Sequence, residues 1–156
     1  MIQRIQTLFL FIVFVLCLAA FFFPIANFFS SPVYTIELSV LGIKEYTDYN
    51  MTWPNTILLP VVLGLTGLIA FATIFLYKNR RVQVRLIRFD LLLNIIYLAL
   101  IFFYYVPALE TLTLTSAEYI TEPGIYFPLF STVFLILANR FITKDDKLVR
   151  SANRLR

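Results

Sequence analysis

The stretch that decides the fold is residues 56–77, TILLPVVLGLTGLIAFATIFLY, which contains no charged side chain. A helix needs about 20 apolar residues to cross the hydrocarbon core of a bilayer. Backbone N–H and C=O groups find no hydrogen-bond partner in lipid, so an apolar run of this length must satisfy them internally as a helix. We therefore predict a transmembrane helix over residues 56–77.

Three further apolar runs of similar length extend this prediction to the whole chain. The chain is 60% hydrophobic and only 14% charged, more apolar surface than a soluble domain of this size can bury. The first run is too long for a cleaved signal peptide, so we interpret it as a retained anchor. We predict a single all-α integral membrane domain over residues 1–156, a four-transmembrane-helix bundle with spans at about 7–29, 56–77, 89–108 and 122–141.

The basic residues predict which side each segment faces. Of the 13 Lys and Arg residues, all except Lys44 lie in the N-terminus, in the segment 78–88 or in residues 140–156. Cytoplasmic segments of membrane proteins carry this excess of positive charge. We expect both termini, the loop 78–88 and the tail 142–156 to be cytoplasmic, and the loops 30–55 and 109–121 to be outside.

The outer loops have the pattern of strands rather than of plain linkers. Apolar Tyr34, Ile36, Leu38 and Val40 alternate with other residues before Gly42, a candidate turn or bulge, and ETLTLT (residues 110–115) also alternates. A period of two is typical of a β-strand. We predict a small extracytoplasmic β-containing cap that pairs the two loops; the alternative is an extended loop on the lipid headgroups.

Several functional classes lack the residues they need. The chain has one cysteine and no histidine, which removes the commonest general base and metal ligand. Neither a phosphate-binding loop nor a dinucleotide fingerprint is present. We therefore predict no catalytic, cofactor-binding or metal-binding residues. Nucleic acid is not expected as a partner either, because no stacking aromatic side chains are interleaved with the basic residues.

Asp90 is the most suggestive ionisable residue. With Asn94 and Tyr97 it shares one face of a helix, and an acid inside a membrane suggests a functional site. The simpler interpretation is structural. In that interpretation Asp90 lies near a helix N-terminus at the cytoplasmic end of its span and pairs with the basic residues Arg85 and Arg88.

Another pattern concerns helix packing. Gly64, Gly67 and Ala70 recur at steps of three in the second span, and small residues at this spacing let helices approach closely. We expect packing within the chain rather than a dimer contact.

The charged tail, residues 142–156, is predicted to hold a short cytoplasmic amphipathic helix. Leu148, Ala152 and Leu155 would form its apolar stripe, with Arg150 and Arg154 on other faces. Such a helix is too short to be stable alone in water, so it needs a surface. We expect it to dock on a partner protein; the alternative is lipid.

Three segments give the chain a family resemblance: the opening MIQRIQT (residues 1–7), the FFFP at residues 21–24, and the ending NRFITKDDKLVRSANRLR (residues 139–156). With these the sequence resembles an uncharacterised bacterial family of short four-helix membrane proteins, domain of unknown function 4293. The resemblance implies the inner membrane of a Gram-negative bacterium, and it implies no substrate and no catalytic residue.

The sequence leaves three classes of function open. The first is a non-catalytic accessory or scaffold subunit that associates with another membrane protein, which fits the small size and the lack of a catalytic set. The second is a small transporter or channel component, which would need polar groups in mid-membrane, where the sequence offers almost none. The third is an integral membrane enzyme, which would depend on outer-loop acids such as Glu118 and Glu122. We expect the first.

Overall fold

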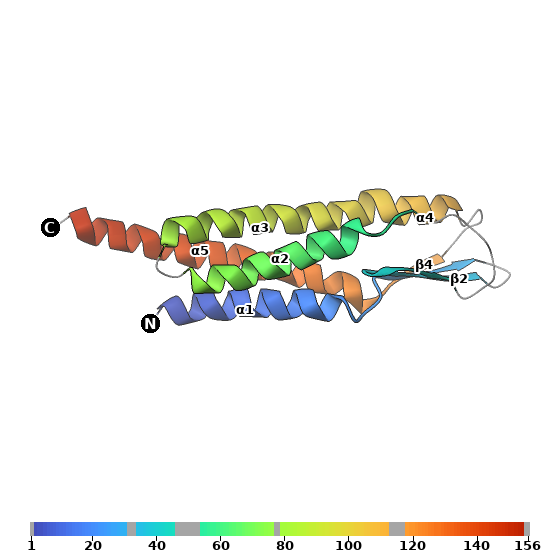
Figure 1. The fold of residues 1–156 in the computed structure, drawn as a ribbon, viewed down its shortest axis with the longest axis horizontal. Coiled ribbons are helices and arrows are strands. Elements are labelled where there is room, and N and C mark those ends of the chain that lie inside the picture. Colours follow the sequence, from blue (N-terminus) through green and yellow to red (C-terminus); the bar gives the residue numbers. More distant parts are fainter. Residues whose placement is uncertain (1, 31–33, 46–53, 77–78, 113–117, 155–156) are drawn as a thin grey trace.

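The computed structural model describes residues 2–30, 34–45, 54–76, 79–112 and 118–154 (Figure 1). The fold is mostly helical, with four long helices and a small antiparallel sheet beyond one end of them. The long helices are α1 (Ile2–Ala20), α2 (Leu58–Phe75), α3 (Arg80–Leu100) and α5 (Tyr126–Arg154). We call the end at which α3 begins the Arg80 end and the opposite end the sheet end. Helix α1 begins and α5 ends at the Arg80 end.

Among the described residues, three helical segments are long and apolar enough to cross a membrane. By length and composition they confirm three of the four predicted spans. They are Leu58–Phe75, Arg80–Thr111 and Pro123–Asp145, and Ile5–Ala20 is a shorter apolar helix.

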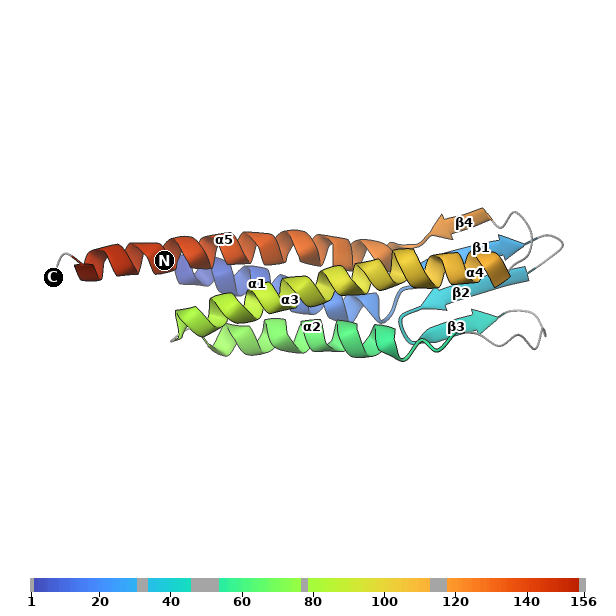
Figure 2. The ribbon, with the colours of Figure 1, turned by 90° about the horizontal axis from the view of Figure 1, so that it is seen from above.

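The four helices pack in a ring in which α1 and α3 each contact both α2 and α5 (Figure 2). Each helix contributes one apolar stripe to the interior, and fully buried Leu10, Leu63, Ile87 and Leu135 come from the four different helices. Many large apolar side chains on the other faces are exposed, as expected of helices surrounded by lipid.

The first helix is shorter at the sheet end than the predicted span. Helix α1 ends at Ala20, and residues Ala26–Ser30 form strand β1 instead of continuing the span to residue 29. Pro24 lacks a backbone N–H and cannot continue a helix. In β1, Ala26 and Phe28 are buried while Phe29 is exposed, the alternation of a strand. Apolar composition alone did not distinguish a lipid-embedded helix from a strand that faces a protein core.

The prediction that residues 78–88 form a loop is also largely wrong. Helix α3 begins at Arg80, so most of this segment is helical. Gln83 and Ile87 are buried while Arg81, Arg85 and Arg88 are exposed, so the basic residues occupy the outer face of an amphipathic helix. The third helical segment therefore starts well before residue 89.

At its sheet end this segment changes its helical form. The π-helical segment η1 (Ile101–Tyr105) and helix α4 (Val106–Leu112) follow α3 without a break. Pro107 lies two residues after η1, and proline removes a backbone donor from a helix, which favours irregular turns beside it.

The fourth predicted span and the tail form one helix. Helix α5 runs unbroken from Tyr126 to Arg154, so the tail is a continuation of α5 rather than a separate short helix. The sequence after Pro128 contains neither glycine nor proline, so nothing in it stops the helix. Pro128 itself lies in the first turn, where proline is tolerated.

The predicted small β-containing cap is confirmed as an antiparallel sheet, but the second loop does not pair with the strands of residues 34–45. Its strand pairs with β1, which the prediction had placed in the first span. Its strand order is β3 (Gly42–Glu45), β2 (Tyr34–Ser39), β1, β4 (Glu118–Thr121), and all neighbours are antiparallel. The second loop supplies β4, which pairs with β1 through Asn27 and Ile120. Ser39 pairs with Gly42 across the β2–β3 turn. Gly42 is the first residue of β3 and the turn itself is formed by Val40 and Leu41, so the predicted turn lies directly before Gly42 rather than on it.

The alternation predicted around ETLTLT does not correspond to a strand where the structure describes it. Residues 110–112 belong to α4, and residues 113–117 lie outside the described residues. In β2, Ile36 and Leu38 are buried as predicted, and they share one apolar core with Val106 and Leu109 of α4. Helix α4 lies over the sheet (Figures 1 and 2).

Candidate functional site

The middle of the helical ring contains a cluster of buried polar side chains. Asp90, Asn94 and Tyr97 lie on one face of α3 and each is 0% exposed, which confirms that they share a face and shows that this face points into the protein. The hydroxyls of Thr66 in α2 and Ser131 in α5 are buried as well, and so is the thiol of Cys17 in α1. We call these six residues the central polar cluster.

Asn94 ties α3 to α5. Its Nδ2 group donates hydrogen bonds to the carbonyl oxygen of Pro128 and to Oγ1 of Thr132, each at 3.0 Å. A carbonyl oxygen has two lone pairs, so Pro128 O can accept from a side chain in addition to a helical bond, and it also accepts from Thr132 Oγ1 at 3.0 Å. The Oδ1 atom of Asn94 has no hydrogen-bond partner among the described residues.

Cys17 connects the helices on the other side of the ring. Its Sγ atom lies 3.7 Å from Oγ1 of Thr66, and Thr66 already donates its hydrogen to the carbonyl oxygen of Leu63 at 2.7 Å. The thiol is therefore the donor in the Cys17–Thr66 contact, since each hydroxyl has a single hydrogen. Cys17 also lies beside the Ser131 hydroxyl and within electrostatic range of Asp90.

The structural interpretation of Asp90 predicted from the sequence is wrong in its details. Because α3 begins at Arg80, Asp90 lies about three turns inside the helix rather than at its N-terminus. Arg85 and Arg88 are exposed, and neither carboxylate oxygen of Asp90 has a hydrogen-bond partner among the described residues. The ion pairs that the described residues form join Lys44 to Glu37 and Arg80 to Asp145.

Several buried oxygen atoms in the cluster share this lack of a partner. Within the described part of the chain, Asp90 Oδ1 and Oδ2, Asn94 Oδ1, Tyr97 OH and Ser131 Oγ accept and donate no hydrogen bond. Buried polar groups are nearly always satisfied, so a concentration of unsatisfied ones marks a site that holds something further or that changes shape.

The expectation that mid-membrane positions offer almost no polar groups is therefore overturned. Cys17, Thr66 and Ser131 belong to three different helices, and small polar residues of this kind are ordinary packing residues in membrane helices. Their convergence on Asp90 depends on how four separate helices pack. The shared face of Asp90, Asn94 and Tyr97 was the one signal in the sequence that pointed to this site.

A second group of polar side chains lies nearer the Arg80 end. Gln6, Gln83, Asn139 and Thr143 are buried or half-buried there. Gln83 Nε2 donates to the carbonyl oxygen of Thr73 at 3.3 Å, whereas Gln6 Nε2, Asn139 Oδ1 and Thr143 Oγ1 have no partner in the described residues. An apolar layer that includes Leu10, Ile87 and Ala138 separates this group from the central polar cluster along the helices.

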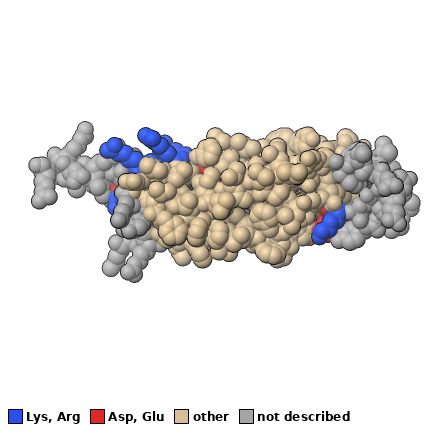
Figure 3. Space-filling view, viewed as in Figure 1, with Lys and Arg blue, Asp and Glu red and all other residues tan. Residues whose placement is uncertain are grey.

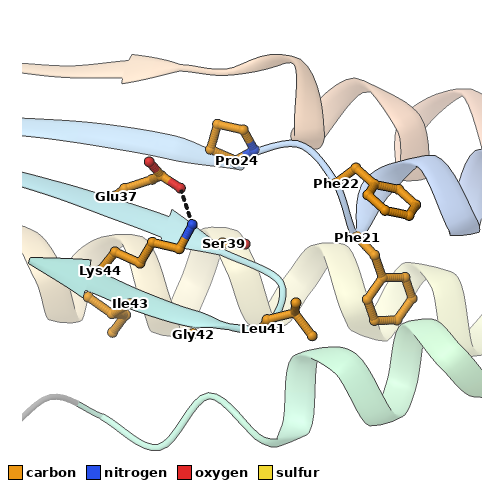
Figure 4. Close-up of a pocket in the computed structure, with 9 residues that line it drawn as sticks. All are labelled: Phe21, Phe22, Pro24, Glu37, Ser39, Leu41, Gly42, Ile43 and Lys44. Carbon is orange, nitrogen blue, oxygen red and sulfur yellow. Dashed lines mark hydrogen bonds and ion pairs between the residues drawn. The ribbon is translucent and has the colours of Figure 1, made fainter.

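At the sheet end an open pocket of about 220 Å³ lies between the end of α1 and the β2–β3 hairpin (Figure 4). Phe21 and Phe22 line one end, and the ion pair between Lys44 Nζ and Glu37 Oε1, at 3.4 Å, lies at the other. Because the Lys44 side chain is 66% exposed, this pair is screened by water. The pocket contains no arrangement of nucleophile and base.

The charged surface has two poles. On the face drawn in Figure 3, basic side chains gather at the Arg80 end, and a smaller charged group lies near the sheet, with a broad uncharged band between them. Among the described residues no group of three or more Cys, Asp or Glu side chains could hold a metal ion.

The predicted helix-packing residues differ in their surroundings. A Cβ atom on Gly67 would lie 3.3 Å from Cys17 Cβ, so α1 and α2 are close there, and Ala70 is fully buried. A Cβ on Gly64 would meet nothing within 4 Å.

The predicted docking residues lie in or beyond the last turns of α5. Leu148, Arg150, Ala152 and Arg154 have helical backbone, while their side chains and all of Leu155 lie outside the described residues.

These features define the class: a mostly helical protein whose helices could cross a membrane, with a polar cluster inside the helical ring and a small sheet at one end. The family model described as Domain of unknown function (DUF4293) matches residues 2–155, and the chain belongs to that family. No curated protein sequence matches the chain.

Proposed function

We propose that this protein is a non-catalytic accessory or scaffold subunit of the bacterial inner membrane that associates with another membrane protein. In this proposal α1, α2, the segment from α3 to α4, and α5 form a four-span bundle. Both termini are cytoplasmic, because the Arg80 end carries the basic residues of the α2–α3 connection and of α5. The sheet then lies on the outer side.

The observation that carries the proposal is the length of α5. A helix of 29 residues is about 43 Å long, more than the roughly 30 Å of a bilayer core. Its C-terminal part extends beyond the start of α1 in both views (Figures 1 and 2). The ion pair between Arg80 Nη1 and Asp145 Oδ2, at 2.9 Å, fixes α5 where it leaves the ring.

Beyond Asp145 the helix needs a surface of another kind. This end continues α5 and so needs no separate nucleation. The sequence places Leu148, Ala152 and Leu155 on one face of it, and an apolar face of this kind is unfavourable in water. Asp145 and Asp146 interrupt the basic residues, which disfavours an anionic lipid surface and favours a protein groove that receives an amphipathic helix.

The test is co-purification from cross-linked membranes in mild detergent. We expect a stoichiometric membrane-protein partner with the full chain, and its loss both after truncation at Lys147 and in the Leu148→Asp/Leu155→Asp variant. Asn153→Asp adds a negative charge away from the stripe and should keep the partner. Retention of every interaction by the truncated chain, at a normal protein level, would contradict the proposal.

The central polar cluster favours one second candidate, a small transporter or channel component. Polar groups inside a membrane bundle are costly and are typical of pathways for ions or protons. Transport of a solute by the purified protein in liposomes, without any partner, would favour this candidate over an accessory subunit.

A further inference from the structure

We infer that Asp90 is a proton-binding site in the interior of the membrane. In this proposal the carboxyl carries a proton while the helical ring is closed. It releases that proton to water when the helices around it separate. The inference concerns the central polar cluster and does not depend on the docking of α5.

The first step is the cost of charge at this position. An ionised carboxylate that is removed from water without a partner is unfavourable by several kcal/mol or more. Asp90 is fully buried, and both its oxygens lack a partner in the described residues. The neutral acid avoids this cost and can also donate a hydrogen bond, so the closed ring favours the protonated form.

The second step is that no neighbouring helix supplies a compensating charge. Helix α2 contains no charged residue. Helix α1 contributes the thiol of Cys17, and its charged residue, Arg4, belongs to its first turn, at the Arg80 end. The charged residues of α5, Arg140, Lys144 and Asp145 among them, lie toward the Arg80 end, away from Ser131. On α3 itself Tyr97 shares the buried face, while Arg85 and Arg88 are exposed.

The third step assigns a proton rather than a metal ion. A metal ion needs several oxygens that converge on one point, whereas a proton needs one oxygen. Among the described residues Asp90 has no second carboxylate beside it and belongs to no metal-binding group. The hydroxyls of Tyr97 and Ser131 and the Asn94 Oδ1 atom are available to bond the acid, or a water molecule beside it, after small side-chain movements.

The fourth step gives the direction of access. Toward the Arg80 end the interior contains Gln6, Gln83 and Thr73 beyond one apolar layer. Toward the sheet end it contains fully buried Leu59 and Leu109 with Ile101, and beyond them the buried Tyr105, whose hydroxyl already donates to the carbonyl oxygen of Asn55 at 2.8 Å. Water reaches polar interiors more easily than apolar ones, so the proton exchanges with the Arg80 end.

Infrared spectroscopy of the purified protein in lipid tests the protonation state. A protonated carboxylic acid has a C=O stretching band distinct from the bands of carboxylates. At pH 7 we expect this band in the wild type, its loss in Asp90→Asn and its retention in Glu110→Gln, which changes an exposed acid of α4. If Asp90→Asn does not insert, Asp90→Glu serves instead and should shift the band.

An acid C=O band of equal intensity in the wild type and in Asp90→Asn would overturn the inference, because the band would then not come from Asp90. Loss of the band on adding Na⁺ at constant pH would also overturn it, since the site would then take a metal cation.

The side of access is tested by isotope exchange. In D₂O, Gln83→Leu should slow the isotope shift of the band and Tyr105→Phe should not. The reverse result would overturn the assigned side of access.

Discussion

The backbone N–H of Gly124 donates a hydrogen bond to the carbonyl oxygen of Pro24 at 2.8 Å. This bond joins Pro24, two residues before strand β1, to the short 3-10 turn η2 (Pro123–Ile125) that precedes α5, although the two residues are far apart in the sequence. The approach is close because Gly124 has no side chain, and a Cβ atom there would overlap the carbonyl oxygens of Pro24 and Phe23.

Gly124→Ala should therefore destabilise the protein. Backbone atoms are the obstacle, so the junction between the helices and the sheet must shift, and overpacking of this kind costs about 1–3 kcal/mol. The measurement is the midpoint of thermal unfolding in detergent. Gly64→Ala is the matched control, because a Cβ at Gly64 meets nothing within 4 Å. Equal midpoints for the two variants would contradict the close approach.

Asn94→Leu should weaken the contact between α3 and α5. The change removes the hydrogen bonds to Pro128 O and Thr132 Oγ1, and side-chain hydrogen bonds between membrane helices contribute about 0.6 kcal/mol on average and up to about 1.7 kcal/mol. Equilibrium unfolding in mixed micelles measures the loss. Thr132→Ser keeps the hydroxyl that accepts from Asn94 and donates to Pro128 O and should cost less; an equal or greater cost would argue against this assignment.

The ion pair between Arg80 and Asp145 should show its effect in a charge exchange. The side chains are 25% and 15% exposed, and a partly buried pair of this kind contributes about 1 kcal/mol. We expect Arg80→Asp and Asp145→Arg each to lower the unfolding midpoint, and the double variant to recover most of it. No recovery in the double variant would mean that the pair does not hold α5 at this point.

The proposed orientation predicts a labelling pattern. In a Cys17→Ser background, Leu41→Cys should react with an impermeant thiol reagent added from the periplasmic side, and Asn79→Cys should not. Leu41 is 69% exposed in the β2–β3 turn, and Asn79 is exposed at the start of α3, so access to the side chain does not limit either reaction. The opposite pattern would reverse the topology.

The sequence by itself determined the helical segments that could span a membrane and the strand character of residues 34–39. Both depend on local periodicity and composition: an uncharged run such as residues 56–77 has few alternatives to a helix in lipid, and the alternation of Ile36 and Leu38 indicates one buried face. The shared face of Asp90 and Asn94 follows from the 3.6-residue period in the same way.

Tertiary structure decided what covers each apolar surface. Residues 26–29 fall within the first predicted span, yet they form β1, because β2 and β4 satisfy the backbone groups of the strand on both sides. Likewise Cys17, Thr66 and Ser131 became a site with Asp90 through the ring of four helices. Periodicity reports which residues share a face; which faces meet depends on contacts between residues distant in the sequence, and no local pattern contains them.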